Sequence, residues 1–240
     1  MTAKQLEVDV IPLTQSFIFK TRVGKAIVNP VNQYLDEMLA DENAKSHAHK
    51  LVGQITRGKQ LEISLKEDRI TPLINIIQSL GLNYYDYFYK RTEDTSQPKK
   101  VAHVYTMWSV HSYAGDYNPL HDHGAQTLQG LSGSLYTKIP PAIQESSNDL
   151  DLRNASGNQN GYLQFVYGDS PVIGPSMFKI PQNMAVRPVV GDLYLWPSWL
   201  EHMVYPFDGE GERRSIAFNI SFHKPGEEKS IRSNDFLFDH

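Results

Sequence analysis

From Val101 onward the sequence consists of short apolar and aromatic runs separated by Gly, Pro, Asn and Ser. Short runs interrupted repeatedly by turn-forming residues are typical of many β-strands joined by turns. About eight such strands fit a jelly roll, the double-stranded β-helix in which two antiparallel sheets face each other. We therefore predict a mainly β fold with a barrel core at about residues 101–223. The candidate strands are 101–111, 118–123, 130–138, 161–167, 176–180, 184–189, 192–197, 201–206 and 214–223.

Two helical segments precede this β region, one from Val31 to about Ala44 and one from Thr71 to about Tyr89. Their apolar residues recur at helical spacing, and Thr71-Pro72 is a good opening because proline suits the first helical turn. Gly81 is a candidate interruption of the second helix. We expect this helical support, within residues 31–90, to pack outside the barrel.

The segment before the helices and one long loop complete the expected organisation. Residues 6–20 are rich in β-branched and aromatic side chains and contain Pro12, which predicts a strand at a sheet edge. By analogy with β-helix proteins that pair through an N-terminal strand, this segment is a candidate contact for a homodimer. Residues 141–160 are polar and predict a mobile loop, which could lie over the mouth of a binding site in the barrel. A length of 240 residues without repeat or linker predicts one domain over residues 1–240.

Composition excludes several classes of function. The formal charge of −4 and the lack of a long Lys/Arg block argue against bulk nucleic-acid binding through the phosphate backbone. No apolar run approaches the roughly 20 residues that cross a bilayer, and the N-terminus lacks the apolar core of a signal peptide. We therefore expect a soluble, cytoplasmic protein. Because the chain has no cysteine, redox chemistry would need a bound metal or cofactor.

Three histidines form the candidate metal site. His121 and His123 are one residue apart on a predicted strand, so both would project from the same face and could reach one ion. His202 follows the stretch from Gly191 to Pro197, which reads as a strand running into a turn and would return this residue to the barrel mouth. Three imidazoles suit iron, zinc, copper or nickel. The alternative is a pair of hydrogen-bonded strand histidines, with His202 capping a turn.

A His-x-His pair alone is weak evidence for a metal site, since the sequence contains a second one. His47 and His49 lie in a polar stretch, and we predict that they are solvated surface residues.

The simplest interpretation of the three tryptophans is that they lie in the core or at the rim of the barrel, although one near the metal could shape a substrate pocket. They are Trp108, Trp196 and Trp199.

Spacing around the histidines resembles two known motifs. Gly115, His121, His123 and Gly133 resemble the first cupin motif without its acidic ligand, and Gly191, Pro197 and His202 resemble the second. The closer resemblance, over about residues 8–223, is to a family of 2-oxoglutarate- and iron(II)-dependent oxygenases. It is carried by the runs Trp108…Gly115-Asp-Tyr-Asn…His121-x-His123, Leu131-Ser-Gly-Ser-Leu-Tyr136, Gly191 through His202-x-Val204-x-Pro206, and Arg213-x-Ser215-Ile-Ala-Phe-Asn219.

This resemblance implies a binding site for 2-oxoglutarate as co-substrate beside Fe(II). Family members place a basic residue beyond the distal histidine, and Arg213 stands there, eleven residues on. Its guanidinium would form two parallel charge-assisted hydrogen bonds to the distal carboxylate. Ser215 would face the same side, Tyr136 and Asn219 are further candidate donors, and Arg214 would point outward on a regular strand. The alternative is that Arg213 is a surface arginine on an edge strand.

One departure from the family pattern bears on activity. His123 stands where most such enzymes have an aspartate, and Asp122 would face away unless the strand bulges. The resemblance implies an Fe(II)/2-oxoglutarate-dependent dioxygenase hydroxylating a primary substrate that the sequence does not identify. A second hypothesis is a three-histidine metal cupin that acts without 2-oxoglutarate. A third is a non-catalytic, metal-containing binding module.

Overall fold

The structure is a computed structural model and describes residues 7–12, 17–48, 54–91, 98–123, 130–146, 159–167 and 183–227. Within them lie helices α1 (Lys25–Ala40), α2 (Thr71–Arg91) and α3 (Pro141–Ser146). The strands are β1 (Val8–Pro12), β2 (Phe17–Arg22), β3 (Lys59–Glu62), β4 (Val101–Ser112), β5 (Asn118–His121), β6 (Gly130–Lys138), β7 (Leu163–Val166), β8 (Asn183–Val186), β9 (Asp192–Pro197), β10 (Glu201–Val204) and β11 (Arg213–His223).

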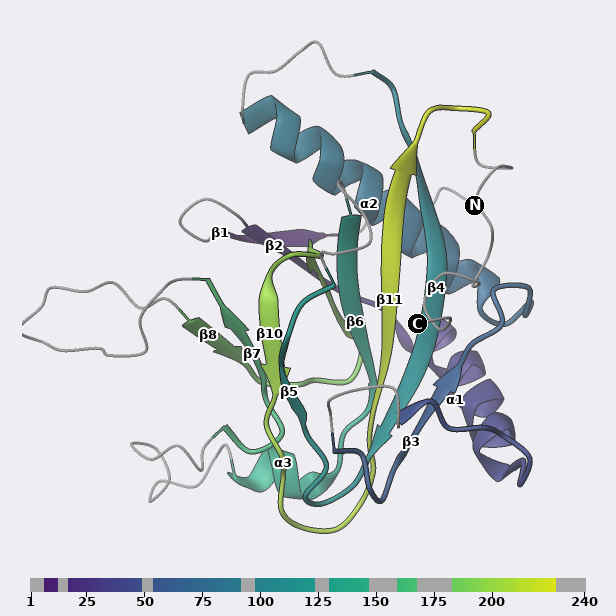
Figure 1. The fold of residues 1–240 in the computed structure, drawn as a ribbon, viewed down its shortest axis with the longest axis vertical. Coiled ribbons are helices and arrows are strands. Elements are labelled where there is room, and N and C mark those ends of the chain that lie inside the picture. The colour runs from purple at the N-terminus through teal and green to yellow at the C-terminus, as the bar shows by residue number, and fades with distance from the viewer. Residues whose placement is uncertain are drawn as a thin grey trace, which may run out of the picture.

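The strands form two antiparallel sheets, as predicted. The larger has the order β1-β2-β9-β6-β11-β4-β3, and the smaller has the order β5-β10-β7-β8. Figure 1 shows β11, the long yellow strand, between β6 and β4, with the short strands β5, β10, β7 and β8 to their left. The fold is mainly β and is that of a double-stranded β-helix, which confirms the predicted fold class.

Alternation along β11 gives the large sheet two different faces. Arg213 and Ser215 line a pocket between the sheets, whereas Ile216 and Phe218 belong to a hydrophobic core on the opposite face. This core includes Val31 and Leu35 of α1 and Leu73 and Ile77 of α2, all fully buried. The two main helices therefore cover the outer face of the large sheet, as expected of the helical support (Figure 1).

The helix boundaries differ from those expected. Helix α1 begins at Lys25 and ends at Ala40, with Pro30 inside it, whereas the expected helix ran from Val31 to about Ala44. Helix α2 passes Gly81 without a break. A Cβ at Gly81 would lie 3.1 Å from Ile220 Cδ1, so glycine here allows the helix to approach β11 closely. The expected interruption at Gly81 was therefore wrong.

Other differences concern short elements. The single strand predicted over residues 6–20 forms β1 and β2, and β1 is an edge strand, as expected. Strand β3 was not predicted, and residues 141–146 of the expected loop form helix α3. The remainder of that loop to residue 158, and the candidate strand 176–180, lie outside the described residues. Neither the single domain nor the homodimer is tested here, and both stay predictions.

No helix in the described part of the chain is long and apolar enough to span a membrane.

Candidate functional site

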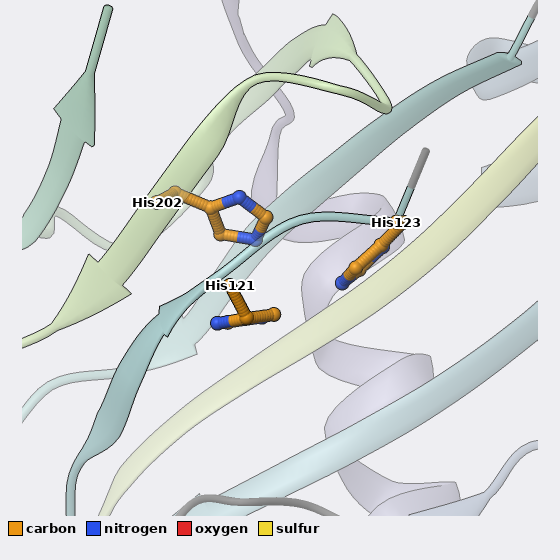
Figure 2. Close-up of side chains that lie close together, drawn as sticks. All are labelled: His121, His123 and His202. Atoms are coloured by element: carbon orange, nitrogen blue, oxygen red, sulfur yellow. The ribbon is translucent and has the colours of Figure 1, made fainter. Parts of the chain in front are cut away.

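The three predicted ligands meet at the edge of the small sheet. Strands β5 and β10 pair with His121 opposite His202. His123 lies two residues beyond the end of β5, not on the strand as expected, and its backbone N–H donates a 2.8 Å hydrogen bond to the carbonyl of Ser198. One nitrogen from each imidazole lies within 4.8 Å of the other two, and the rings surround a common space (Figure 2). Within the described residues this cluster contains no carboxylate.

Hydrogen bonds to backbone carbonyls orient two of the rings. His121 Nδ1 lies 2.7 Å from the carbonyl oxygen of Pro119, and His202 Nδ1 lies 2.9 Å from that of Leu200. Because a carbonyl oxygen only accepts, each Nδ1 must carry the proton. Each Nε2 then keeps a free lone pair, which is the form of histidine that binds a metal.

A side-chain network performs the same task for His123. Its Nδ1 lies 2.9 Å from Asn219 Oδ1 and 3.1 Å from Ser132 Oγ. Ser132 Oγ is also 2.8 Å from Asn219 Oδ1 and 3.0 Å from Ser198 Oγ. With the Asn219 oxygen facing His123, the imidazole carries its proton on Nδ1 and exposes the Nε2 lone pair.

Burial keeps the three imidazoles neutral. It lowers the pKa of His121 below the usual value of 6.5, and it lowers that of His123 to about 4. Burial and the neighbouring histidines hold the pKa of His202 well below its usual range. A metal needs the neutral imidazole, so the site requires no deprotonation before an ion binds at neutral pH. The residues present therefore fit a divalent transition metal.

Arg213 lies in the same pocket and is 2% exposed. Its Nη2 is 3.5 Å from the hydroxyl oxygen of Tyr136, and its guanidinium lies 5.1 Å from the centre of that ring. Among the described residues no carboxylate pairs with it, and its buried Nε has no hydrogen-bond partner. A buried cation without a counterion is costly, so this pocket fits an anionic ligand such as the distal carboxylate of 2-oxoglutarate.

Arg214 points to the outer side of the sheet, as expected on a regular strand. Helix α1 covers that side, so Arg214 is buried there and is 1% exposed. Its guanidinium pairs with Glu212 at 2.7 Å and with Asp36 of α1 at 2.5 Å. The two neighbouring arginines therefore differ in their surroundings: Arg214 ties α1 to the sheet, and Arg213 faces the pocket without a carboxylate partner among the described residues.

The remaining predicted residues are distributed around this pocket. Ser215 and Tyr136 line it beside Arg213, whereas the side-chain oxygen of Asn219 is engaged with His123. Trp108 and Trp196 also line the pocket, and Trp199 is 56% exposed. His47 is half-buried, not solvated as expected, and His49 lies outside the described residues.

Sequence reasoning did not single out Ser132 and Ser198. Ser132 lies in the family-like run from Leu131 to Tyr136, and strand alternation places it on the same face as Tyr136. That alternation was the available signal. Its partners come from β11 and from the turn after β9, and no local pattern links those segments.

Part of the chain matches a known protein family in sequence. Residues 106–219 match a family model described as "Putative 2OG-Fe(II) oxygenase", and this family binds Fe(II) and 2-oxoglutarate. No curated protein matches the chain.

Solved structures share the fold. A prolyl-4-hydroxylase from Pseudomonas putida is 12% identical with a TM-score of 0.52, covering 87% of this chain and 93% of its own. SnoN, a non-heme alpha ketoglutarate dependent epimerase from nogalamycin biosynthesis, is 11% identical with a TM-score of 0.56. The match covers 85% of this chain and 77% of SnoN. AviO1 from Streptomyces viridochromogenes Tue57 is 13% identical with a TM-score of 0.52. The match covers 87% of this chain and 90% of AviO1. Residues 106–219 thus match this family in sequence, and the chain shares its fold with solved structures such as the prolyl-4-hydroxylase and SnoN, which confirms the resemblance found in the sequence.

Proposed function

We propose that the protein is an Fe(II)- and 2-oxoglutarate-dependent dioxygenase that hydroxylates a still unidentified substrate. His121, His123 and His202 would hold the iron, and Arg213 would hold the co-substrate. The observation that carries this proposal is that three neutral imidazoles with free lone pairs share one pocket with a buried guanidinium that has no counterion among the described residues.

Each residue of the pocket has a definable task in this reaction. Arg213 would donate two parallel hydrogen bonds to the distal carboxylate of 2-oxoglutarate, and Tyr136, packed against the guanidinium, would hold it in place. Ser215, on the same face of β11, offers a hydroxyl donor to the same ligand. Iron, once bound, would supply the oxygen chemistry: one atom of O₂ enters 2-oxoglutarate, which is converted to succinate and CO₂, and the other enters the hydroxylated substrate.

The three-histidine ligand set has an electrostatic consequence. A site with two histidines and one carboxylate neutralises one of the two positive charges of Fe(II), whereas three neutral imidazoles neutralise none. The dianionic co-substrate would therefore meet a more positive metal, so we expect 2-oxoglutarate and iron to strengthen one another's binding. The same ligand set also favours the second candidate function, a three-histidine metal cupin without 2-oxoglutarate.

The rest of the pocket wall indicates what kind of group the substrate presents. Apart from the three histidines and Arg213, the described lining residues are uncharged and include Ile55, Trp108, Val110 and Tyr117. Burying a charge against such a wall without a partner is unfavourable. We infer that the part of the substrate that enters the pocket is uncharged.

The test is the visible charge-transfer absorption that 2-oxoglutarate produces when it chelates Fe(II), recorded anaerobically. Wild type should show the band, and His202→Ala should lose it along with the metal. Arg213→Ala should keep the metal but require at least about 100-fold more 2-oxoglutarate, since two hydrogen bonds to a charged group are lost and each is worth roughly 1.5–3 kcal/mol. Arg69→Ala, an arginine that does not line the pocket, is the matched control and should behave like wild type.

Two results would change the assignment. Unchanged 2-oxoglutarate affinity in Arg213→Ala would mean that this arginine does not bind the co-substrate. Bound iron without a band at saturating 2-oxoglutarate would replace the proposal with the three-histidine cupin or the non-catalytic binding module. A purely structural metal usually has a fourth protein ligand, and the described cluster has three.

A further inference from the structure

Asn219 contacts the metal site from the opposite sheet. It lies on β11, is 2% exposed, and its Oδ1 is 2.9 Å from Nδ1 of His123. The same oxygen is 2.8 Å from Ser132 Oγ, so it accepts from two side chains at once. When one ring nitrogen of a histidine donates a hydrogen bond to an acceptor and the other binds the metal, the acceptor fixes both the tautomer and the orientation of the imidazole ring.

His123 needs this contact more than the other two ligands do. His121 and His202 each find an acceptor two residues back in their own strand region, at the carbonyls of Pro119 and Leu200. His123 lies beyond the end of β5, and its Nδ1 contacts two side chains of the large sheet, Asn219 Oδ1 at 2.9 Å and Ser132 Oγ at 3.1 Å. Its protonation form is therefore set by tertiary structure, whereas local backbone geometry sets the other two.

The side-chain amide of Asn219 could in principle present either of two ends to His123. The oxygen accepts, which places the imidazole proton on Nδ1 and leaves Nε2 free for a metal. The NH₂ group donates, which would leave the proton on Nε2 and block ligation. The structure has the first arrangement: Asn219 Oδ1 lies 2.9 Å from His123 Nδ1 and accepts a second hydrogen bond from Ser132 Oγ at 2.8 Å.

We propose that Asn219, held by Ser132, is a positioning residue that makes His123 a metal ligand by keeping its proton on Nδ1. The inference rests on the metal site of the proposed function. It assigns Asn219 a task different from binding 2-oxoglutarate, which was the expectation from sequence.

The experiment reads the His123 tautomer directly, by ¹⁵N NMR of the imidazole nitrogens in the metal-free, full-length protein. Wild type should show the proton on Nδ1. Asn219→Leu, which has similar volume but no acceptor, should move it largely to Nε2, whereas Asn219→Asp keeps an acceptor and should resemble wild type. Cobalt(II) titrations should show a loss of about 10- to 100-fold in affinity for Asn219→Leu and rescue in Asn219→Asp.

The matched control is Ser221→Ala on the same strand. It removes a 2.6 Å hydrogen bond between β11 and the imidazole of His223, which is not part of the metal cluster. Cobalt affinity and the His123 tautomer should not change. Equal effects in Ser221→Ala and Asn219→Leu would show that general disturbance of β11, and not a specific acceptor, matters, and would overturn the proposal.

Two other results would also overturn it: a proton on Nε2 of His123 in metal-free wild type, or a folded Asn219→Leu with wild-type tautomer and cobalt affinity. Should Asn219→Leu not fold, the spectra of wild type and Asn219→Asp decide by the same criterion. None of these measurements involves 2-oxoglutarate. Absence of the charge-transfer band together with the expected tautomer shift would therefore refute the dioxygenase proposal and leave this inference standing.

Discussion

At the scale of single residues, Gly133 of β6 shows how closely the core packs behind the site. A Cβ added there would lie 2.3 Å from the Phe218 ring and 2.6 Å from the carbonyl oxygen of Tyr194. Both neighbours are held within the large sheet, so neither can move away easily. This position therefore constrains the sheet that carries Arg213 and Asn219.

We expect Gly133→Ala to lower the free energy of unfolding by about 1–3 kcal/mol through overpacking, measured by urea denaturation. Gly24→Ala is the control, because a Cβ there meets nothing within 4 Å. It should cost no more than about 1 kcal/mol, the difference between glycine and alanine at a helix N-cap. Equal losses in the two variants would contradict the packing argument.

Residue positions were predictable from sequence where strand alternation or motif spacing decides them. His121, His202 and Arg213 could be assigned to one site because their motif spacing carries that information. The burial of Arg214 could not be predicted, because it depends on α1 covering the outer face of the sheet. The link between His123 and Asn219 was missed for the same reason: it joins segments 96 residues apart.

At the scale of elements, an ion network with a buried centre joins α1 to the start of β11. Glu212 accepts hydrogen bonds from His111 of β4 at 2.6 Å, from Lys138 of β6 at 2.8 Å and from Arg214 at 2.7 Å. Arg214 continues to Asp36 on α1. Glu212 and Arg214 flank Arg213 in sequence, so the network also fixes the backbone of Arg213, the residue proposed to bind the anionic co-substrate.

This network should make stability depend on acid pH. Burial alone would raise the pKa of Glu212, but hydrogen bonds from His111, Arg214 and Lys138 outweigh it and hold the pKa well below the ordinary 4.5. The unfolded chain thus binds the proton first, and the stabilisation is complete above pH 4.5 and lost as the pH falls below it. Between that value and the folded pKa, the loss approaches about 1.4 kcal/mol per pH unit for one proton.

Denaturant unfolding at a series of acidic pH values checks this expectation. Glu212→Gln should be less stable than wild type at neutral pH, and its stability should fall less steeply as the pH is lowered. Glu42→Gln, a substitution of an exposed residue, is the control and should keep the wild-type slope. Parallel slopes in wild type and Glu212→Gln would show that Glu212 does not supply the acid sensitivity.

Long periodic elements were predictable, whereas short ones and boundaries were not. Helix α2 and strands β4, β6, β9 and β11 have enough apolar periodicity to show their type. Helix α1 begins at Lys25, six residues before the expected start at Val31, and it includes Pro30. Strand β3 and helix α3 have four and six residues, too few for a periodic pattern, and tertiary contacts decide their conformation.

At the scale of the whole molecule, the candidate site draws on both sheets. Strand β10 and the region of β5 supply the three imidazoles, and β11 of the large sheet supplies Arg213 and Asn219. The site is complete only when the two sheets pack together, so a metal should bind the folded chain far better than the unfolded chain. Metal binding and global stability are therefore linked.

We expect anaerobic Fe(II), at about a hundred times its dissociation constant, to stabilise the fold by about 2.7 kcal/mol. This corresponds to a rise in Tm of roughly 5–11 °C for a chain of this length, measured by differential scanning fluorimetry. His202→Ala should lose the rise. His47→Ala, from the second His-x-His pair, should keep it, and loss of the rise in that variant would place a metal elsewhere.

Because the two groups that would hold 2-oxoglutarate belong to different layers, the spacing of the sheets would select the length of the diacid. Facing sheets pack about 10 Å apart, and the close-packed interior between them resists compression. A diacid shorter by one methylene would reach either the metal or Arg213, but not both. Core side chains that touch no ligand would thus take part in choosing the co-substrate, and a change of co-substrate would require a repacked interior, not a new loop.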